Sequence, residues 1–351
     1  MLPYWLLLLV PAWAAFQEAA LGKNRFQHYP GLGPFVFLLS VFIGLRYNVG
    51  GDWTNYLGYY YRSAEYSLYE AVSSSDPGYI LFNWMAAHWG VGIWFVNLAC
   101  AALFSIGLVA FARAQPRPWL ALLVAVPYLV IVVAMGYTRQ GVAIGLAMLA
   151  LRAFTRDKSV VKFVFWIALA ATFHKSAVML VPLAALSSDR GRVWTAAWIA
   201  GATALLYYLF LEDSVDRLMY GYITREYQSQ GAAIRVAMNA LPASIFLVFR
   251  RRFQLSPEER RVWTNMALLA LAFVVFLFVS PSSTAVDRLA LYVIPIQLFV
   301  FSRLPEAFPV RGKVSLVVVL VIVYSAAVQF VWLNFAANAK SWVPYSFYPF
   351  S

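Results

Sequence analysis

The residues Ile93–Ala112, IWFVNLACAALFSIGLVAFA, form a run of 20 residues that carries no charged side chain. A helix that crosses the hydrocarbon core of a bilayer needs about 20 predominantly apolar residues. A run of the same kind, Val314–Leu333, lies near the end of the chain. These runs predict transmembrane helices. Because their apolar residues are continuous and do not alternate with polar ones, they disfavour a transmembrane β-barrel.

The composition supports the same prediction for the whole chain. Of the 351 residues, 62% are hydrophobic and 12% are charged. An ordinary soluble domain is about 45–50% apolar and about 25% charged, so this chain has too little polar surface to face water. A soluble enzyme and a disordered chain are therefore both excluded. Further apolar runs lie at 3–16, 33–45, 119–135, 142–151, 193–211, 236–249, 263–279 and 289–301.

We expect an all-α, polytopic transmembrane helical protein with about 10–12 spans, in which residues 1–351 form a single membrane domain. Two stretches, 77–90 and 160–187, contain apolar segments that are too short to cross a bilayer alone. We expect short re-entrant or broken segments at both places.

The formal net charge of +12 indicates the orientation of the chain. Loops on the cytoplasmic side carry an excess of Lys and Arg. When the loops between the apolar runs are assigned to the two sides of the membrane by this rule, 18 basic and six acidic residues lie on the cytoplasmic side. Nine of each lie on the outer side. The outer regions are then the loops 47–76 and 212–234 and the C-terminal tail 334–351. Because the whole surplus belongs to cytoplasmic loops, no nucleic-acid partner is implied.

The same threading predicts a break within 160–187. The basic segments 152–162 and 190–192 both face the cytoplasm, so the stretch between them must cross an even number of times. Two short helices that meet at Phe173–Ser176 satisfy this condition. Non-helical backbone at that depth is tolerated only where it lines a cavity or is buried in protein. In the other short stretch, Asp76 is expected as the N-cap and Pro77 as the first helical residue.

Charged side chains at the outer ends of the spans are the first candidate site residues. Arg46 stands at the apolar end of a span, where a charge is costly unless it is used, and Asp52 follows it after two glycines. Arg139 offers bidentate donors to a phosphate, although snorkelling to lipid headgroups explains it equally well. His174 and Lys175 lie between the two short apolar stretches. A buried Lys needs an anionic partner, and His exchanges protons near neutral pH.

Other candidates for binding an anionic substrate share a position near the outer end of a span: Gln140, Arg225, Arg235 and Arg288. The adjacent Asp287 could simply neutralise Arg288 in a structural pair. Trp53 and Tyr56 belong to an aromatic outer loop. Such rings suit stacking on sugars, and they equally suit an interfacial aromatic belt.

An excess of cations at an apolar mouth indicates an anionic, amphipathic ligand, and a lipid-linked diphosphate fits this description. A carboxylate such as Asp52, or His174, could take the proton from an attacking hydroxyl. The arginines would stabilise the charge that develops on the leaving diphosphate.

Motifs of other reaction classes are absent from the sequence. It has no Gly-rich P-loop, no GxSxG, no HExxH and no Cys/His cluster. Its three histidines have no metal-ligand spacing, and Cys100 is the one cysteine. We therefore expect neither a cofactor nor a metal.

Four short motifs, taken in this order and spacing, resemble the EpsG family. They are Arg46 with Gly51-Asp52-Trp53 and Tyr56, then Asp76-Pro77-Gly78-Tyr79, then Thr138-Arg139-Gln140, and finally Phe173-His174-Lys175-Ser176-Ala177. The resemblance covers roughly residues 30–300. The dipeptide before Asp52 is Gly-Gly where the family often has Gly-Thr, and Asp76 replaces the more usual Glu; neither change removes a charge.

The resemblance implies a Wzy-like exopolysaccharide or O-antigen polymerase of the bacterial inner membrane, active at the periplasmic face. Such an enzyme transfers an undecaprenyl-diphosphate-linked glycan onto another lipid-linked repeat unit, without a metal. Its implied partners are undecaprenyl-diphosphate-linked oligosaccharides, membrane lipid and a chain-length regulator protein. Two alternatives stay open: a flippase or transporter for the same lipid-linked sugar, and an O-antigen ligase-type glycosyltransferase.

The resemblance also suggests roles for the site residues. Arg139, Arg235 and Arg288 would hold the diphosphate, and Lys175 would lie near the leaving group. Either Asp52 or His174 would act as the base.

Overall fold

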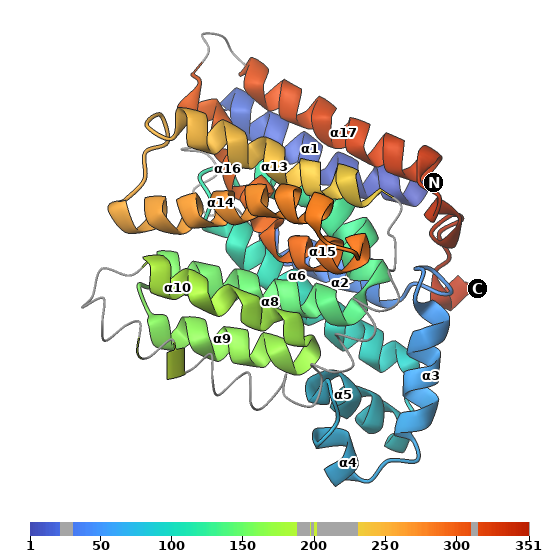
Figure 1. Ribbon diagram of the computed structural model, residues 1–351. Coiled ribbons are helices and arrows are strands. Elements are labelled where there is room, and N and C mark those ends of the chain that lie inside the picture. Colours follow the sequence, from blue (N-terminus) through green and yellow to red (C-terminus); the bar gives the residue numbers. More distant parts are fainter. Residues whose placement is uncertain (22–30, 188–196, 198–199, 202–230, 310–314, 351) are drawn as a thin grey trace.

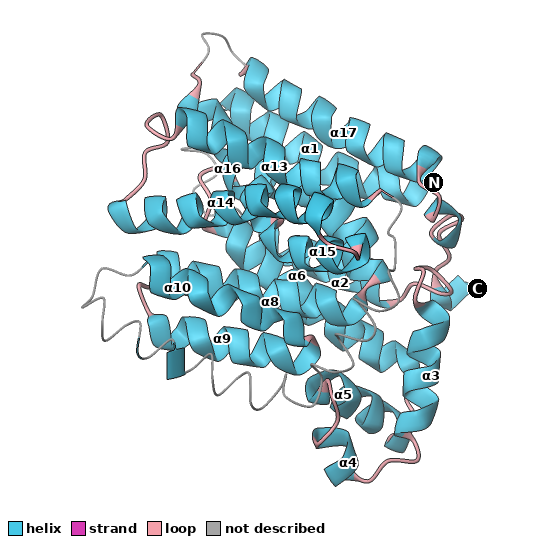
Figure 2. Cartoon of the chain, in the orientation of Figure 1, coloured by secondary structure: helices cyan, strands magenta, loops and turns pink. Residues whose placement is uncertain are grey.

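A computed structural model describes residues 1–351 except 22–30, 188–196, 198–199, 202–230, 310–314 and 351. The described part of the chain is helical, with connecting loops and no strand (Figure 2). The candidate Arg225 and most of both the expected apolar run 193–211 and the expected loop 212–234 lie outside the described residues.

The first half of the chain contains these helices: α1 Leu2–Leu21, α2 Leu32–Gly44, α3 Trp53–Ser63, α4 Leu68–Val72, α5 Pro77–His88, α6 Ile93–Arg113, α7 Pro118–Ala125, the π-helix η2 Val126–Ala134, and α8 Thr138–Thr155 (Figure 1). The second half contains α9 Val160–Phe173, η3 Lys175–Leu180, α10 Val181–Ser187, α13 Ala232–Phe249, α14 Pro257–Val279, α15 Ser283–Ala290, η6 Leu291–Val293, α16 Pro295–Ala307, α17 Leu316–Phe335, η7 Ala339–Ser341 and η8 Tyr348–Phe350.

Among the described residues, four helices are long and apolar enough to cross a membrane: α6, α13, α14 and α17. The pair Ser283–Val293 and Pro295–Ala307, bent by 45°, provides a fifth if it counts as one span. Four more apolar helices, among them Leu32–Gly44 and Val160–Phe173, are shorter. The all-α, polytopic membrane architecture is confirmed. The count of 10–12 spans stays a prediction, since length and composition support four or five of the described helices.

The continuous helix formed by α7 and η2 is the centre of the bundle. Every residue from Pro118 to Ala134 is buried, and α1, α6, α8, α16 and α17 pack around it. A helix that is apolar on all faces belongs either in lipid or in a protein core. The tertiary structure places this one in the core.

The predicted break between α9 and α10 is present. His174 has an extended backbone (φ −158°) between α9 and η3. The start of α9 and the end of α10 lie beside the same helix, α14. Lys158 pairs with Glu258 of α14 at 3.2 Å, and Ser187 accepts a hydrogen bond from Asn265 of α14 at 3.0 Å. His174 therefore lies at the turn of a helical hairpin, as expected for a segment that enters and returns (Figure 1).

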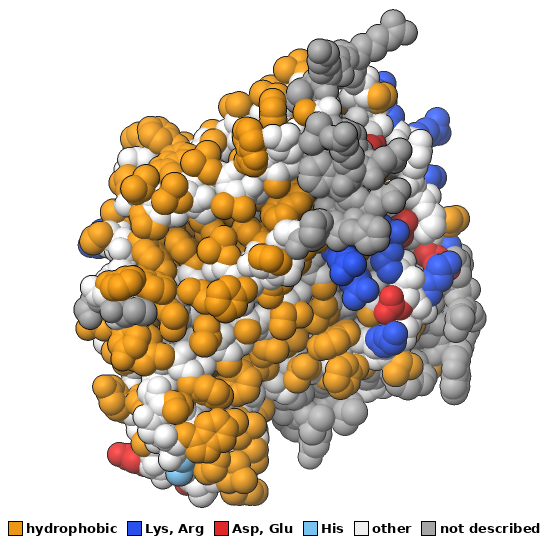
Figure 3. All heavy atoms as spheres, turned by 180° about the vertical axis from the view of Figure 1, so that it is seen from behind, with side chains coloured by type: hydrophobic (Ala, Val, Ile, Leu, Met, Phe, Trp, Pro, Cys, Tyr) orange, Lys and Arg blue, Asp and Glu red, His pale blue; other side chains and the backbone are white. Residues whose placement is uncertain are grey.

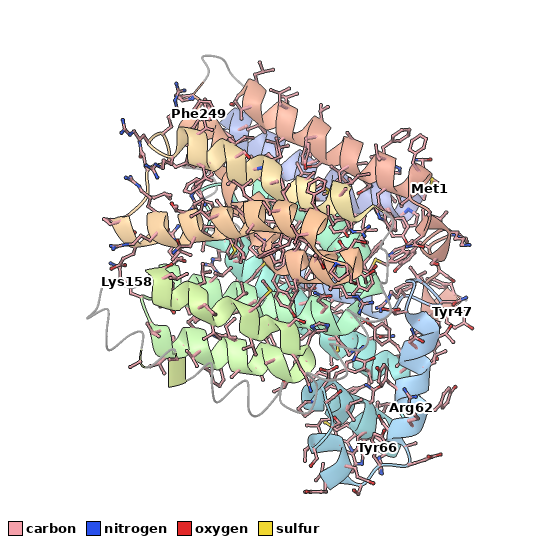
Figure 4. The ribbon with its side chains drawn as sticks, viewed as in Figure 1. Met1, Tyr47, Arg62, Tyr66, Lys158 and Phe249 are labelled. Atoms are coloured by element: carbon pink, nitrogen blue, oxygen red, sulfur yellow. The ribbon has the colours of Figure 1, made fainter. Side chains whose placement is uncertain are left out.

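Basic side chains gather at the end of the bundle that holds Lys158 and Phe249, whereas Met1, Tyr47 and Arg62 lie at the other end (Figure 4). The rear view shows the same clustering of Lys and Arg beside a broad hydrophobic surface (Figure 3). At the basic end, Arg156 donates to the Ala114 carbonyl at 2.5 Å. Among the described residues, the basic loops at 113–117, 152–162 and 250–261 thus meet at one end of the molecule.

The C-terminal tail folds back over the end that lacks this cluster. Tyr47 N donates to the Ser346 carbonyl at 3.0 Å, and Gly50 N donates to the Ser341 carbonyl at 2.8 Å. The Trp342 indole is buried and donates to the Ile131 carbonyl at 2.7 Å. The tail therefore fixes the loop that follows α2, a contact that the sequence does not indicate.

Candidate functional site

Arg139 and Asp76 form the ion pair at the centre of the candidate site. Arg139 Nη1 lies 2.5 Å from Asp76 Oδ2, and the two side chains are 24% and 11% exposed. Arg139 stands at the beginning of α8, and Asp76 occupies the N-cap position of α5. The position of Asp76 before Pro77 is as predicted, but its side chain makes no capping hydrogen bond. The carboxylate binds Arg139 instead, so capping is not the complete explanation of Asp76.

Aromatic rings enclose this ion pair. The Arg139 guanidinium carbon lies 4.8 Å from the centre of the Tyr59 ring and 6.0 Å from that of Tyr79. Contacts of this kind favour a cation, and more strongly when water is excluded. Burial raises the pKa of the Asp76 carboxyl, and the positive charge of Arg139 opposes this rise.

Arg46 differs from its predicted role at the mouth of the site. Its side chain is buried, with 1% exposure, and donates to the carbonyls of Ile43 at 2.6 Å and Val49 at 3.1 Å and to Thr138 Oγ1 at 2.8 Å. Buried charges persist where their donors are satisfied in this way. The guanidinium is therefore committed to the protein, because it joins the end of α2 to the start of α8.

His174 faces Tyr292, a residue of η6. The Tyr292 hydroxyl lies 3.2 Å from His174 Nδ1 and 3.5 Å from the His174 carbonyl oxygen. The positive charges of Arg139 and Arg288 both act on the imidazole, and that of Lys175 acts on Asp76. The hairpin turn thus brings His174 and Lys175 to the Arg139–Asp76 pair.

Arg235 and Asp287 form a second ion pair. Arg235 donates from Nε to Oδ1 at 2.6 Å and from Nη2 to Oδ2 at 2.7 Å, a bidentate arrangement between α13 and α15. The sequence left open a structural pair of Asp287 with its neighbour Arg288. The structure corrects this interpretation, because successive residues of a helix point in different directions.

Arg288 differs from the other cations of the site. Its guanidinium carbon lies 5.9 Å from the centre of the Tyr137 ring, and none of the carboxylates that the structure describes pairs with it. Gln140 Nε2 donates to the Arg288 carbonyl at 2.5 Å. Gln140 was predicted to bind the substrate. It is buried and instead fixes the backbone of Arg288.

Asp52 and the aromatic residues after it lie beside the ion pairs. The Asp52 carboxylate accepts a hydrogen bond from Asn55 at 3.3 Å, and its charge acts on both Tyr56 and Tyr137. Trp53 and Tyr56 are only 7% and 4% exposed. Their burial differs from the wet, sugar-stacking surface that the sequence suggested, because both rings face the protein core.

The structure therefore brings together the described sequence candidates at one end of the bundle, although Arg46, Gln140, Trp53 and Tyr56 are buried supports there. Asp76, Tyr292 and Asp287 belong to the site as partners of Arg139, His174 and Arg235, and the sequence analysis did not include them among its candidates. Asp76 could have been found, since it stands in one of the four motifs. Tyr292 has no local signal, because it reaches His174 only through tertiary packing.

Among the residues that the structure describes, no group of three or more His, Cys, Asp or Glu side chains could hold a metal ion. The charges available at the site are those of the arginines, Lys175 and their acidic partners.

Comparison with known protein families matches residues 33–347 to the EpsG family. Searches of curated proteins and of solved structures gave no match. The family match contains all four sequence motifs and covers most of the chain. It indicates an exopolysaccharide glycosyltransferase or polymerase-like function, and the apolar helices indicate a membrane-embedded protein. On this match, the chain belongs to the EpsG family.

Proposed function

We propose that this protein is a polysaccharide polymerase of the bacterial inner membrane that works at the periplasmic face. It transfers the glycan of one undecaprenyl-diphosphate-linked oligosaccharide onto another lipid-linked repeat unit, without a metal. The observation that carries the proposal is the gathering of three groups at one end of the bundle: the Arg139–Asp76 ion pair, Arg288, whose carbonyl accepts a hydrogen bond from Gln140, and His174 at the hairpin turn.

The proposed reaction is a substitution at the anomeric carbon of the donor sugar. The acceptor hydroxyl oxygen forms the new bond to this carbon, while the bond from the carbon to the diphosphate oxygen breaks. Undecaprenyl diphosphate leaves with the electron pair of that bond. The hydroxyl proton passes to His174 or to Asp52, which are the two candidate bases.

The cations of the site have different tasks in this proposal. Arg288, which has no carboxylate partner among the described residues, is free to bind the diphosphate. Arg139 uses one of its five N–H donors for Asp76, so it can bind an anion with the others. Arg235 is held by Asp287, which balances its charge. Lys175 stands at the hairpin turn and adds positive potential where the leaving group becomes charged.

A polymerisation assay in membranes, with purified lipid-linked repeat units, tests the proposal. We expect Arg139→Ala, Arg288→Ala and His174→Ala to lower the rate by about 100-fold or more, the usual effect of losing a group that stabilises the transition state. Lys340→Ala removes an exposed cation at the same end of the molecule and should leave the rate unchanged. Activity should also persist after chelation of metals. If Arg139→Ala and His174→Ala both kept wild-type rates and chain lengths, the assignment would be wrong.

The glycans of cells that lack the protein distinguish the alternatives. Products limited to single repeat units indicate a lost polymerase, whereas long chains that stay unattached indicate a lost ligase. Repeat units that remain on the cytoplasmic leaflet indicate a lost flippase. A chain-length regulator, if it is a partner, should alter the length of the product without being required for bond formation.

A further inference from the structure

An apolar groove lies between α13 and α17, two of the helices that are long enough to cross a membrane. Its volume is about 690 Å³. One wall is a stripe of α17 that runs from Tyr324 to Phe335, and the other is a stripe of α13 that includes Ile234 and Met238. The floor is the buried π-helix η2, through Tyr128 and Val132.

The spacing of the wall residues makes this groove linear. On α17 the lining residues recur at helical intervals, as in Ala327, Val328 and Val331, so they occupy one face of the helix. At 1.5 Å per residue, the stripe from Tyr324 to Phe335 is roughly 16 Å long. A channel of this shape fits one extended chain better than a compact ligand.

The rim of the groove is apolar and open to its surroundings. Ile234 is 65% exposed and Val331 is 49% exposed. On helices that cross a membrane, such side chains face lipid, and the groove can admit a hydrocarbon chain sideways from the bilayer.

One end of the groove reaches the candidate site. Tyr137 and Arg235 line this end, and the guanidinium carbon of Arg288 lies 5.9 Å from the centre of the Tyr137 ring. The N-terminus of α13 lies here too, with Gly231 as its N-cap, and its dipole adds positive potential. An apolar channel that ends at cations is complementary to an anion that carries one long hydrocarbon tail.

We propose that this groove holds the polyprenyl chain of the lipid-linked substrate and thereby places its diphosphate beside Arg288 and Arg235. The inference rests on the proposed function for the identity of the substrate. It adds the location of the tail, the side from which the substrate enters, and the two helices between which it passes.

Cysteine protection tests the groove without depending on turnover. The one native cysteine, Cys100, is buried, so a new cysteine reacts alone with a maleimide. Ala327→Cys places the thiol in the groove, and Val323→Cys places it one helical turn before, at a position of α17 that does not line the groove and is 57% exposed. The probes are undecaprenyl diphosphate, inorganic diphosphate and phosphatidylglycerol, each added to the purified full-length protein in detergent.

We expect undecaprenyl diphosphate, at about ten times its Kd, to slow labelling at position 327 by about tenfold, because only the unoccupied protein reacts. Labelling at position 323 should not change, and inorganic diphosphate should protect neither position. Equal protection by phosphatidylglycerol would overturn the proposal, because the groove would then be an ordinary lipid site. Absence of protection at position 327 would also overturn it.

A second pair of variants links the groove to activity. Ala327→Trp fills the channel, whereas Leu320→Trp adds the same side chain to an exposed position of α17. We expect only Ala327→Trp to lower polymerisation, with unchanged elution on size exclusion. Polymerisation without protection at position 327 refutes the groove and leaves the proposed function intact. Protection without polymerisation refutes the function and leaves the groove intact.

Discussion

At the scale of single residues, burial decides which charges serve the fold and which serve the site. Arg46, Arg139 and Arg288 all follow or precede apolar segments in the sequence. The Arg46 guanidinium donates hydrogen bonds to three acceptors of its own protein. Arg139 pairs with one carboxylate, and Arg288 pairs with none of the carboxylates that the structure describes. Arginines at similar positions in the sequence therefore differ in whether their guanidinium can still bind a substrate.

Replacement of Arg46 by Met should destabilise the fold. The change leaves the Ile43 and Val49 carbonyls and the Thr138 hydroxyl without their buried donor, and each buried group that loses its partner costs about 1–3 kcal/mol. Thermal unfolding in detergent measures the effect, with the exposed Arg62→Met as the control. A variant that keeps its unfolding temperature but loses activity would contradict this view and restore Arg46 as a substrate ligand.

Tyr292→Phe tests the positioning of His174. Loss of the hydroxyl that lies 3.2 Å from Nδ1 removes a hydrogen bond worth about 1 kcal/mol, so the polymerisation rate should fall by roughly fivefold. The dependence of the rate on pH should shift as well, which a purely structural role would not produce. Tyr69→Phe changes an exposed hydroxyl and serves as the control. An unchanged pH profile would leave Asp52 as the better candidate base.

At the scale of elements, close backbone approach fixes the pairing of α6 with α8. A Cβ placed on Gly107 would lie 2.1 Å from the Gly145 carbonyl oxygen, and one on Gly145 would lie 2.8 Å from Phe104 Cα. Small residues at such contacts let membrane helices pack closely. This packing holds the middle of α8, the helix that carries Arg139 at its beginning, against α6.

Gly107→Ala should separate α6 from α8. Overpacking of this kind costs about 1–3 kcal/mol, and the unfolding temperature should fall accordingly. Gly58→Ala is the matched control, since a Cβ there meets nothing within 4 Å and Ala favours a helix over Gly by about 1 kcal/mol. Equal stability of the two variants would refute the close-packing argument.

At the scale of the whole molecule, the bundle has two chemically different ends. The basic side chains that the structure describes gather at one end (Figure 4). The C-terminal tail contacts the loop after α2 at the other end, where the candidate site lies. The positive-inside rule places the basic end in the cytoplasm.

Cysteine labelling in intact cells checks this orientation. Val161 and Tyr61 are each 66% exposed, and they lie next to Lys162 and Arg62 at the two ends. We expect an impermeant maleimide to label Tyr61→Cys in spheroplasts and Val161→Cys only after permeabilisation. The reverse pattern would place the candidate site in the cytoplasm and would exclude the proposed periplasmic reaction.

The C-terminal tail gives the last prediction. Trp342→Ala removes a buried indole, which costs about 3–5 kcal/mol in a protein core, and it weakens the anchor of the loop 46–52. Both the unfolding temperature and the polymerisation rate should fall. Phe350→Ala changes a side chain that is 90% exposed, so its effect on stability should stay within about 0.5 kcal/mol. Wild-type activity of Trp342→Ala would show that the tail does not position the site.

The all-helical membrane architecture, the grouping of the described basic loops, the break at His174 and the family could all be predicted from the sequence. These properties follow from local features: the length of apolar runs, the charge of loops and the spacing of short motifs. Its interpretation of Arg46, Trp53 and Tyr56 as residues of an open site did not anticipate their burial, because exposure depends on neighbours that are distant in the chain.

The tertiary structure was needed to pair Asp76 with Arg139 and Asp287 with Arg235, and to bring Tyr292 to His174. It also decided that the apolar helix 118–134 is the core of the bundle and not a lipid-facing span, and that the C-terminal tail closes over the site end. An apolar run in the sequence indicates that a segment lies in an apolar environment. Whether that environment is lipid, another helix or the groove beside the site is decided by how the helices pack.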